Sequence, residues 1–153
     1  MKNKPLLQNN DYGCGVFAIM NAINKVSKRQ LTLEDIPRWE KILKTDKEYG
    51  TLRTDLMLKC LRKHFYATMS KKFSKKKMDN WLDRGNQAII LYPYEGKYEL
   101  HYSNIFYRFK DGYEGVNFWI KNNKWARSSK TNERCIKWFY QEGTEIFYLR
   151  ERK

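Results

Sequence analysis

The sequence predicts an α+β domain, with helices first and an antiparallel β-sheet after them. Apolar residues recur with helical spacing between residues 14 and 65, whereas β-branched and aromatic residues dominate from residue 86 onward. Asp111-Gly112 is a strong hairpin signal between two of the β-rich segments. Helices followed by strands, without βαβ alternation, favour a helical layer packed on an antiparallel sheet.

Three helices are expected in the first 65 residues. Residues 14–26 are apolar on nearly every side, which is typical of a buried helix. Thr32 and Asp35 resemble a capping box and predict a second helix, in which Pro37 is an unfavourable residue. The third helix is expected within residues 52–65, where leucines follow a helical period.

The rest of the chain is expected to be mainly strands. A short strand at residues 66–69 precedes a basic loop and a short helix that ends at Gly85. The β-rich segments are residues 86–94, 98–110, 113–121 and 144–152. With 153 residues, no repeat and no linker, residues 1–153 are expected to form a single domain.

Charge is the main compositional signal. Lys and Arg number 31 against 17 Asp and Glu, which gives a formal net charge of +14. This excess favours nucleic acid, another polyanion or an acidic substrate as a partner, although a solvated lysine surface explains it equally well. The basic stretch SKKFSKKKM (residues 70–78) has the same two interpretations. With 41% hydrophobic and 16% aromatic residues, the chain is not expected to be disordered.

The cysteines indicate a reducing environment. Cys14, Cys60 and Cys135 are odd in number and irregularly spaced, which does not suggest a disulfide framework. No CxxC or HxxxH pair is present, so no metal site and no cofactor are expected. There is no apolar signal segment at the N-terminus and no apolar run near the ~18 residues of a membrane span. A cytoplasmic protein without a membrane partner is therefore expected.

Cys14 is the candidate nucleophile. It opens the first predicted helix, where main-chain N–H groups and the helix dipole stabilise a thiolate. Gly13 and Gly15 flank it and leave room for a substrate backbone. Gln8, six residues upstream, could donate its amide to the oxyanion of a tetrahedral intermediate. A buried structural cysteine and a solvated glutamine are the alternatives.

His101 is the candidate base. Only His64 and His101 are present; His64 ends a predicted helix, whereas His101 begins a predicted strand. A third group should fix the tautomer of the imidazole, and the Asp111-Gly112 hairpin would place the Asn117 side chain near His101. Asp111 and Asp11 are rivals for this role, but both are better explained as turn residues.

These residues together resemble the C39 peptidase-like branch of the papain-like cysteine peptidase superfamily. The resemblance covers roughly residues 8–120: QNNDYGCGVFAIMNAIN, LTLEDI, the GTLRTDL segment, LHYSNIFY and VNF. It implies a papain-like fold in which N-terminal helices, with the catalytic cysteine at the start of the central helix, pack on a C-terminal antiparallel sheet. It also implies Cys14, His101 and Asn117 as a triad, Gln8 in the oxyanion hole, and Gly50-Thr51 as the loop before the next helix. The sequence departs from the family pattern at Gly13, where Asp is usual, and at Phe118, where Pro is usual.

The expected function is a cysteine peptidase or thiol hydrolase that cleaves a peptide or isopeptide bond in a peptide or protein substrate. Two alternatives stay open. The chain could be an inactive, basic module of the same fold that binds nucleic acid or a protein partner. It could also be an acyltransferase, because an amine in place of water at the acyl-enzyme needs the same catalytic residues.

Overall fold

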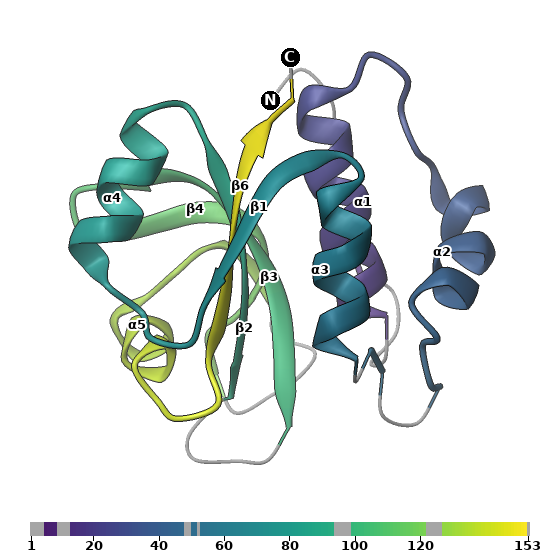
Figure 1. Cartoon of the computed structure of the whole chain (residues 1–153). Coiled ribbons are helices and arrows are strands. Elements are labelled where there is room, and N and C mark those ends of the chain that lie inside the picture. The colour runs from purple at the N-terminus through teal and green to yellow at the C-terminus, as the bar shows by residue number, and fades with distance from the viewer. Residues whose placement is uncertain are drawn as a thin grey trace.

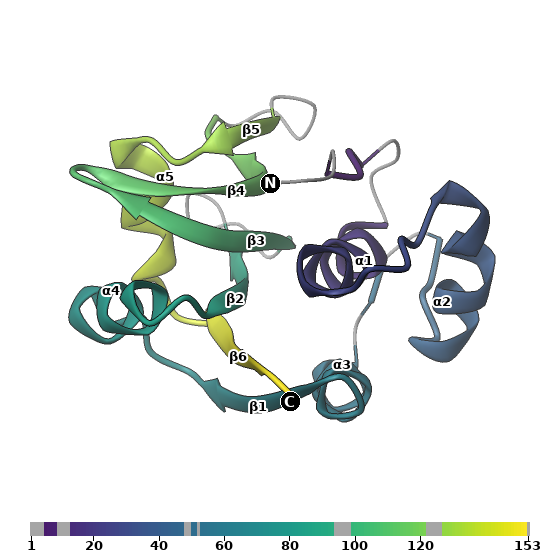
Figure 2. The ribbon, with the colours of Figure 1, turned by 90° about the horizontal axis from the view of Figure 1, so that it is seen from above.

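A six-stranded antiparallel sheet forms the centre of the structure, a computed structural model that describes residues 5–8, 13–47, 50–51, 53–93, 99–121 and 127–152. The strand order is β1-β6-β2-β3-β4-β5, so the last strand in the chain lies inside the sheet (Figures 1 and 2). The strands are β1 (Phe65–Ser70), β2 (Gln87–Pro93), β3 (Leu100–Phe109), β4 (Gly112–Trp119), β5 (Arg127–Lys130) and β6 (Glu145–Glu151).

Helices lie on both faces of this sheet. On one face α1 contacts β3 and β2, and α3 contacts β1; on the other, α4 contacts β3 and α5 contacts β2 and β4 (Figure 2). The helices are α1 (Cys14–Val26), the short 3₁₀ helix η1 (Leu33–Asp35), α2 (Ile36–Ile42), α3 (Thr54–Arg62), α4 (Lys75–Asp83) and α5 (Glu133–Phe139). The sheet therefore separates two hydrophobic clusters.

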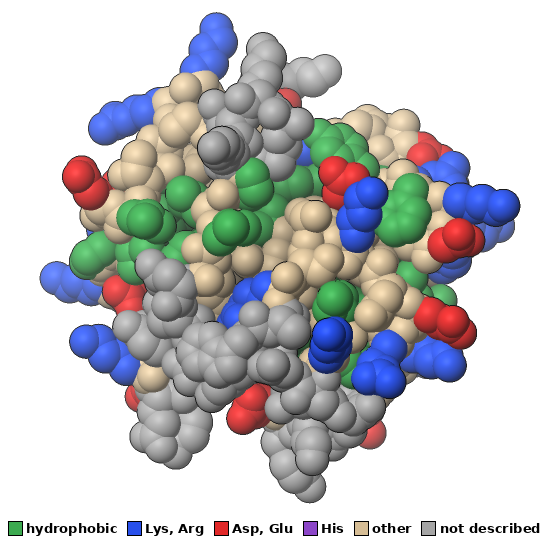
Figure 3. All heavy atoms as spheres, turned by 180° about the vertical axis from the view of Figure 1, so that it is seen from behind, with side chains coloured by type: hydrophobic (Ala, Val, Ile, Leu, Met, Phe, Trp, Pro, Cys, Tyr) green, Lys and Arg blue, Asp and Glu red, His purple; other side chains and the backbone are tan. Residues whose placement is uncertain are grey.

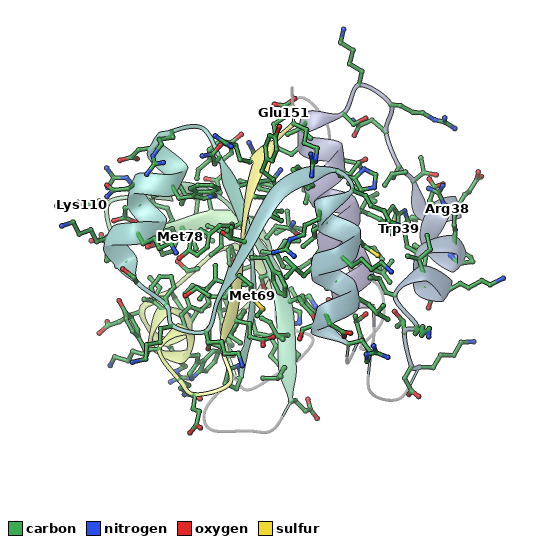
Figure 4. The ribbon with its side chains drawn as sticks, in the orientation of Figure 1. Arg38, Trp39, Met69, Met78, Lys110 and Glu151 are labelled. Atoms are coloured by element: carbon green, nitrogen blue, oxygen red, sulfur yellow. The ribbon has the colours of Figure 1, made fainter. Side chains whose placement is uncertain are left out.

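The α1 side of the core follows from the apolar character of that helix. Every residue of α1 from Cys14 to Asn24 is buried. Burying its apolar side chains against the sheet and α3 removes a large area from water, which is the main stabilising contribution of such a layer. Trp39, 5% exposed, points from α2 toward the rest of the helical layer, whereas Met78 points from α4 toward the opposite face of the sheet (Figure 4).

The predicted α+β class is confirmed, and most element positions agree. Thr32 and Asp35 do form a capping box, and Pro37 lies in the first turn of α2, where its missing N–H costs nothing. The short strand and the short helix predicted before residue 86 are β1 and α4, but the general order of helices before strands is too simple, because α5 lies between β5 and β6. Neither β5 nor α5 was predicted; both come from a segment with no clear periodicity. None of the helices in the described ranges has the length and apolar character that a membrane crossing needs.

Candidate active site

The candidate site lies where β4 separates from β3. The described pairing of these strands runs from Phe109–Gly112 to Asn104–Val116 and includes a register shift between Ile105 and Tyr107. Directly after this pairing, Asn117 has a left-handed backbone with φ of 63°. The start of α1 and the N-terminal segment, residues 5–8, lie beside this opening (Figure 2).

Cys14 is the first residue of α1 and is 9% exposed. Its sulfur accepts a hydrogen bond from the main-chain N–H of Tyr102, the residue that follows His101. Gly15 lets the start of α1 lie close to the side chains of Thr51 and Tyr102, because a Cβ at that position would lie 2.7 Å from Thr51 Oγ1 and 3.3 Å from Tyr102 Cδ2. The start of α1 is therefore held between β3 and the predicted Gly50-Thr51 loop.

His101 is almost completely buried at the start of β3. It is 1% exposed, and its ring stacks on that of Trp119 with centroids 4.2 Å apart and an interplanar angle of 7°. Its Nε2 lies 2.5 Å from the main-chain oxygen of Asn117. A carbonyl can only accept, so Nε2 carries the hydrogen, and Nδ1 is the nitrogen that has a lone pair for a proton.

The structure brings Cys14 next to the main chain of β3 but does not join the two side chains. Among the described residues, no hydrogen bond connects the Cys14 sulfur to the imidazole of His101. The sulfur is bonded to the next residue along, Tyr102. Arg127 lies close enough for its charge to act on both groups. Cys14 and His101 are therefore neighbours through the main chain of β3 and through the charge of Arg127.

Asn117 contacts His101 through its main chain and not through the expected side-chain amide. Its carbonyl accepts from His101 Nε2 and from Ser103 Oγ, the latter at 3.0 Å. Its side-chain Oδ1 accepts the N–H of Gln8 at 3.3 Å, and its Nδ2 donates to the carbonyl of Leu6 at 3.5 Å. The left-handed backbone of Asn117 explains the difference, because it turns the amide toward the N-terminal segment and the carbonyl toward β3.

Of the two rival acids, the one that the structure describes, Asp111, is not near the imidazole. Asp111 is exposed in the β3–β4 turn. It is separated from His101 by the length of β3, on the order of 26 Å at the usual rise per strand residue. Asp11 lies outside the described residues.

Gln8 is held in place by Asn117 and by Arg127, the first residue of β5. The Nε of Arg127 donates to Gln8 Oε1 at 3.2 Å. An amide accepts only through its oxygen, so this bond identifies Nε2 as the donor end of the Gln8 side chain. The N-terminal segment is also tied to α1, where Asn21 accepts from Leu6 N at 2.7 Å and donates to Leu6 O at 2.9 Å.

A cavity of about 460 Å³ adjoins these residues. It lies between the N-terminal segment, β4 and β5, and its lining includes Gln8, Asn117 and Arg127. Most of the lining is apolar, from Pro5, Leu7 and Val116 among others. Figure 3 shows the molecule from behind, with hydrophobic side chains gathered toward the middle of the face and most Lys and Arg at its rim. A cavity of this size and character suits part of a small ligand or a few side chains of a peptide.

Burial dominates the protonation states of the pair. It raises the pKa of the Cys14 thiol, whereas the hydrogen bond from Tyr102, the charge of Arg127 and the N–H groups at the helix start lower it. Burial also lowers the pKa of His101 to about 3, and Arg127 acts in the same direction. The sequence predicted a stabilised thiolate at the helix start; the structure instead favours a neutral thiol beside a neutral imidazole.

Three residues next to the site were not predicted from the sequence. Trp119 stacks on His101, Arg127 bonds Gln8, and Tyr102 supplies an N–H to the sulfur. The hairpin signal at Asp111-Gly112 already placed a residue near 119 opposite His101, so Trp119 could have been found by counting. No pattern in the sequence predicted a strand at β5, so nothing pointed to Arg127 as a neighbour of the site.

No protein-family model and no curated protein matches the sequence. Among solved structures, the fold is similar to the peptidase domain of Streptococcus ComA, described as a bi-functional ABC transporter involved in a quorum sensing pathway. The match has a TM-score of 0.64 and 16% sequence identity, and it covers 95% of this chain and 97% of that chain. The chain therefore has the C39-like, papain-like cysteine peptidase fold that its residues resemble.

Proposed function

We propose that the protein is a cysteine peptidase or related thiol hydrolase that cleaves a peptide or isopeptide bond. The observation that carries the proposal is the position of Cys14 at the start of α1, with its sulfur bonded to the main chain of β3 beside His101. The similarity of the fold to a peptidase domain supports it. Gln8, Asn117 and Arg127 meet at the same opening.

The reaction starts from the neutral pair. As the Cys14 sulfur forms a bond to the acyl carbon, its proton passes to Nδ1 of His101 and the carbonyl oxygen becomes an oxyanion. The side-chain amide N–H of Gln8 (Nε2) and the main-chain N–H of Cys14 donate to that oxyanion. The proton then moves from His101 to the departing amine, and water releases the acyl group by the same steps in reverse order.

The positioning groups differ from the expected triad. The Asn117 carbonyl, and not its side chain, holds the Nε2 hydrogen of His101 and so presents Nδ1 to the sulfur. Arg127 binds the side-chain oxygen of Gln8, so it is the Nε2 hydrogens of Gln8 that donate to the oxyanion. Its positive charge also favours the negative charge that develops at the sulfur and at the oxyanion.

The test compares the wild-type protein with Cys14→Ser and His101→Gln variants on a peptide library digested from a denatured proteome. Mass spectrometry should find new peptide termini with the wild type only, since either substitution removes a reacting group. Circular dichroism and a thermal melt check that both variants are folded. New termini that appear equally with Cys14→Ser would refute the proposal, as would none with any of the three proteins.

The same experiment separates hydrolysis from acyl transfer. In a buffer that contains no amine, a hydrolase releases free carboxylic acids, whereas an acyltransferase stalls as a thioester on Cys14. Intact-protein mass spectrometry detects such a thioester as an added mass. A stalled acyl-enzyme that is released only by an added amine would identify transfer as the function.

A further inference from the structure

A second surface of the molecule combines cations with aromatic rings and lies outside the candidate active site. It begins at β1, an edge strand of the sheet, and continues across β6 to one side of α4. Tyr66 of β1 is 48% exposed and pairs across the strands with Arg150 of β6. The guanidinium groups of Arg150 and Arg152 lie 4.8 Å and 4.5 Å from the centre of its ring.

The surface continues along β6 onto α4. Tyr148 lies on the same face of β6 as Arg150, two residues away, and Lys77 of α4 lies 4.5 Å from the centre of its ring. Trp81, one helical turn beyond Lys77, packs edge-on against Tyr148, and Arg84 lies 5.8 Å from the Trp81 ring. Figure 4 labels Met78 on α4 and Glu151 at the end of β6, the two elements that this surface connects.

Helix α4 separates its charges by side. Its acidic residues turn away from β6: Asp79 pairs with Lys75, and Asp83 pairs with Arg108 of β3. Asp79 also accepts a hydrogen bond from Tyr113 of β4. These contacts occupy the carboxylates on the β3–β4 side of the helix, so they do not neutralise the cations on its β6 side.

The positive charges of this surface are not neutralised by described acidic side chains, so they are available to an anionic partner. In the described part of the chain, no ion pair involves Arg84, Arg150 or Arg152. The basic stretch at residues 70–78 runs from the end of β1 into α4 and contributes Lys77 to the surface. The whole chain carries a formal charge of +14, which attracts polyanions over long range.

We propose that this surface, made of Tyr66, Lys77, Trp81, Arg84, Arg150 and Arg152, binds single-stranded nucleic acid. The cations contact phosphates, and the half-exposed ring of Tyr66 together with the flat guanidinium groups that lie over it offers planes on which unpaired bases stack. A row of cations alone would suit any polyanion; the alternation with aromatic rings favours single strands, whose bases are free to stack. The proposal is independent of peptidase activity.

The test measures binding of fluorescein-labelled dT20 by fluorescence anisotropy to the full chain carrying Cys14→Ser. If about four phosphates are contacted, raising the salt from 50 mM to 200 mM should weaken binding about 50-fold. Arg84→Glu/Arg150→Glu should weaken binding at least about tenfold at 50 mM salt. Both side chains are exposed, and within the described ranges their contacts are cation–π contacts, so the fold should tolerate the change.

Two comparisons make the test specific. Lys28→Glu/Lys41→Glu changes the net charge equally at exposed positions on the α1–α2 side, and it should weaken binding less than about threefold. Tyr66→Ala keeps the charge and should weaken binding about tenfold, the usual scale of one stacked base. Undetectable binding at 50 mM salt overturns the proposal, as does an equal loss in both double variants. Tighter binding to vesicles with 30% phosphatidylserine, unaffected by Tyr66→Ala, would identify a membrane surface instead.

Discussion

Cys14 and Cys135 are both buried residues in the first turn of a helix, yet their surroundings differ. Cys135 of α5 donates to Tyr92 Oη at 3.8 Å within the apolar core, and burial raises its pKa to about 12. The N–H of Cys135 is itself used by the Asn132 cap. The sulfur of Cys14 instead accepts an N–H from Tyr102 and lies in the field of Arg127. A helix start alone does not activate a thiol; donors and a positive charge directed at the sulfur are also needed.

The largest effect expected from this comparison concerns alkylation. At pH 8, iodoacetamide should modify Cys14 about 100-fold faster than Cys135, since a base and N–H donors assist only Cys14. Peptide mass spectrometry after timed quenching measures both rates. In urea the two rates should become equal, which controls for intrinsic differences. Equal rates in the folded protein would contradict the comparison.

The next effect is a loss of stability at acid pH. The pKa of His101 is lowered to about 3 in the folded state, below the ordinary value of 6.5, so the unfolded chain binds the extra proton. This contribution to stability is complete above pH 6.5 and is lost as the pH falls toward 3. Between pH 7 and 5 the wild type should lose about 2 kcal/mol more than His101→Gln, measured by urea unfolding. His64→Gln, at an exposed position, should retain most of the wild-type pH dependence.

Removing the charge of Arg127 should have a smaller effect on the sulfur. Arg127→Met should slow the alkylation of Cys14 several-fold at pH 8, because loss of the positive charge raises the pKa of the thiol and so lowers the thiolate fraction. Arg127→Lys keeps the charge and loses the Nε donor to Gln8, so it should restore the alkylation rate more fully than peptide cleavage. Arg53→Met, which removes an exposed ion pair with Asp55, is the control. An unchanged alkylation rate in Arg127→Met would remove Arg127 from the mechanism.

The smallest effect concerns the backbone of Asn117. Asn117→Ala should destabilise the fold by about 1–2 kcal/mol, because alanine resists the left-handed conformation and cannot bind Leu6 and Gln8. Asn117→Gly adopts that conformation freely and should cost less. Both variants keep the carbonyl that holds His101, so Asn117→Gly should retain alkylation at Cys14. A rate as low as that of His101→Gln would show that the side chain is required.

The sequence allowed more of the fold to be predicted than of the site. Helical periodicity located α1, and the Asp111-Gly112 turn located the β3–β4 hairpin, because both are local patterns. Local patterns do not reveal that β6 inserts between β1 and β2, nor that β5 adds Arg127 to the site. These placements depend on contacts between segments far apart in the chain.

The same limit applies to Asn117. Its residue type predicted a side-chain role, but the register shift near Phe106 and the left-handed backbone decide which of its atoms meets His101. The shift aligns Asn117 with Ser103, on the same face of β3 as His101, so it is the left-handed backbone that turns the amide away toward Leu6 and Gln8. Trp119 occupies the position opposite the imidazole instead.

The main-chain carbonyl beside His101 changes what evolution must preserve at this position. A side-chain amide or carboxylate restricts the position to Asn or Asp, whereas a carbonyl is supplied by every amino acid. The requirement passes from side-chain chemistry to backbone shape: Gly, Asn and Asp, which tolerate a positive φ, become interchangeable there. Distant relatives that use the same carbonyl could then lack the Asn or Asp of the usual triad in their sequences and still hold the imidazole in the same tautomer.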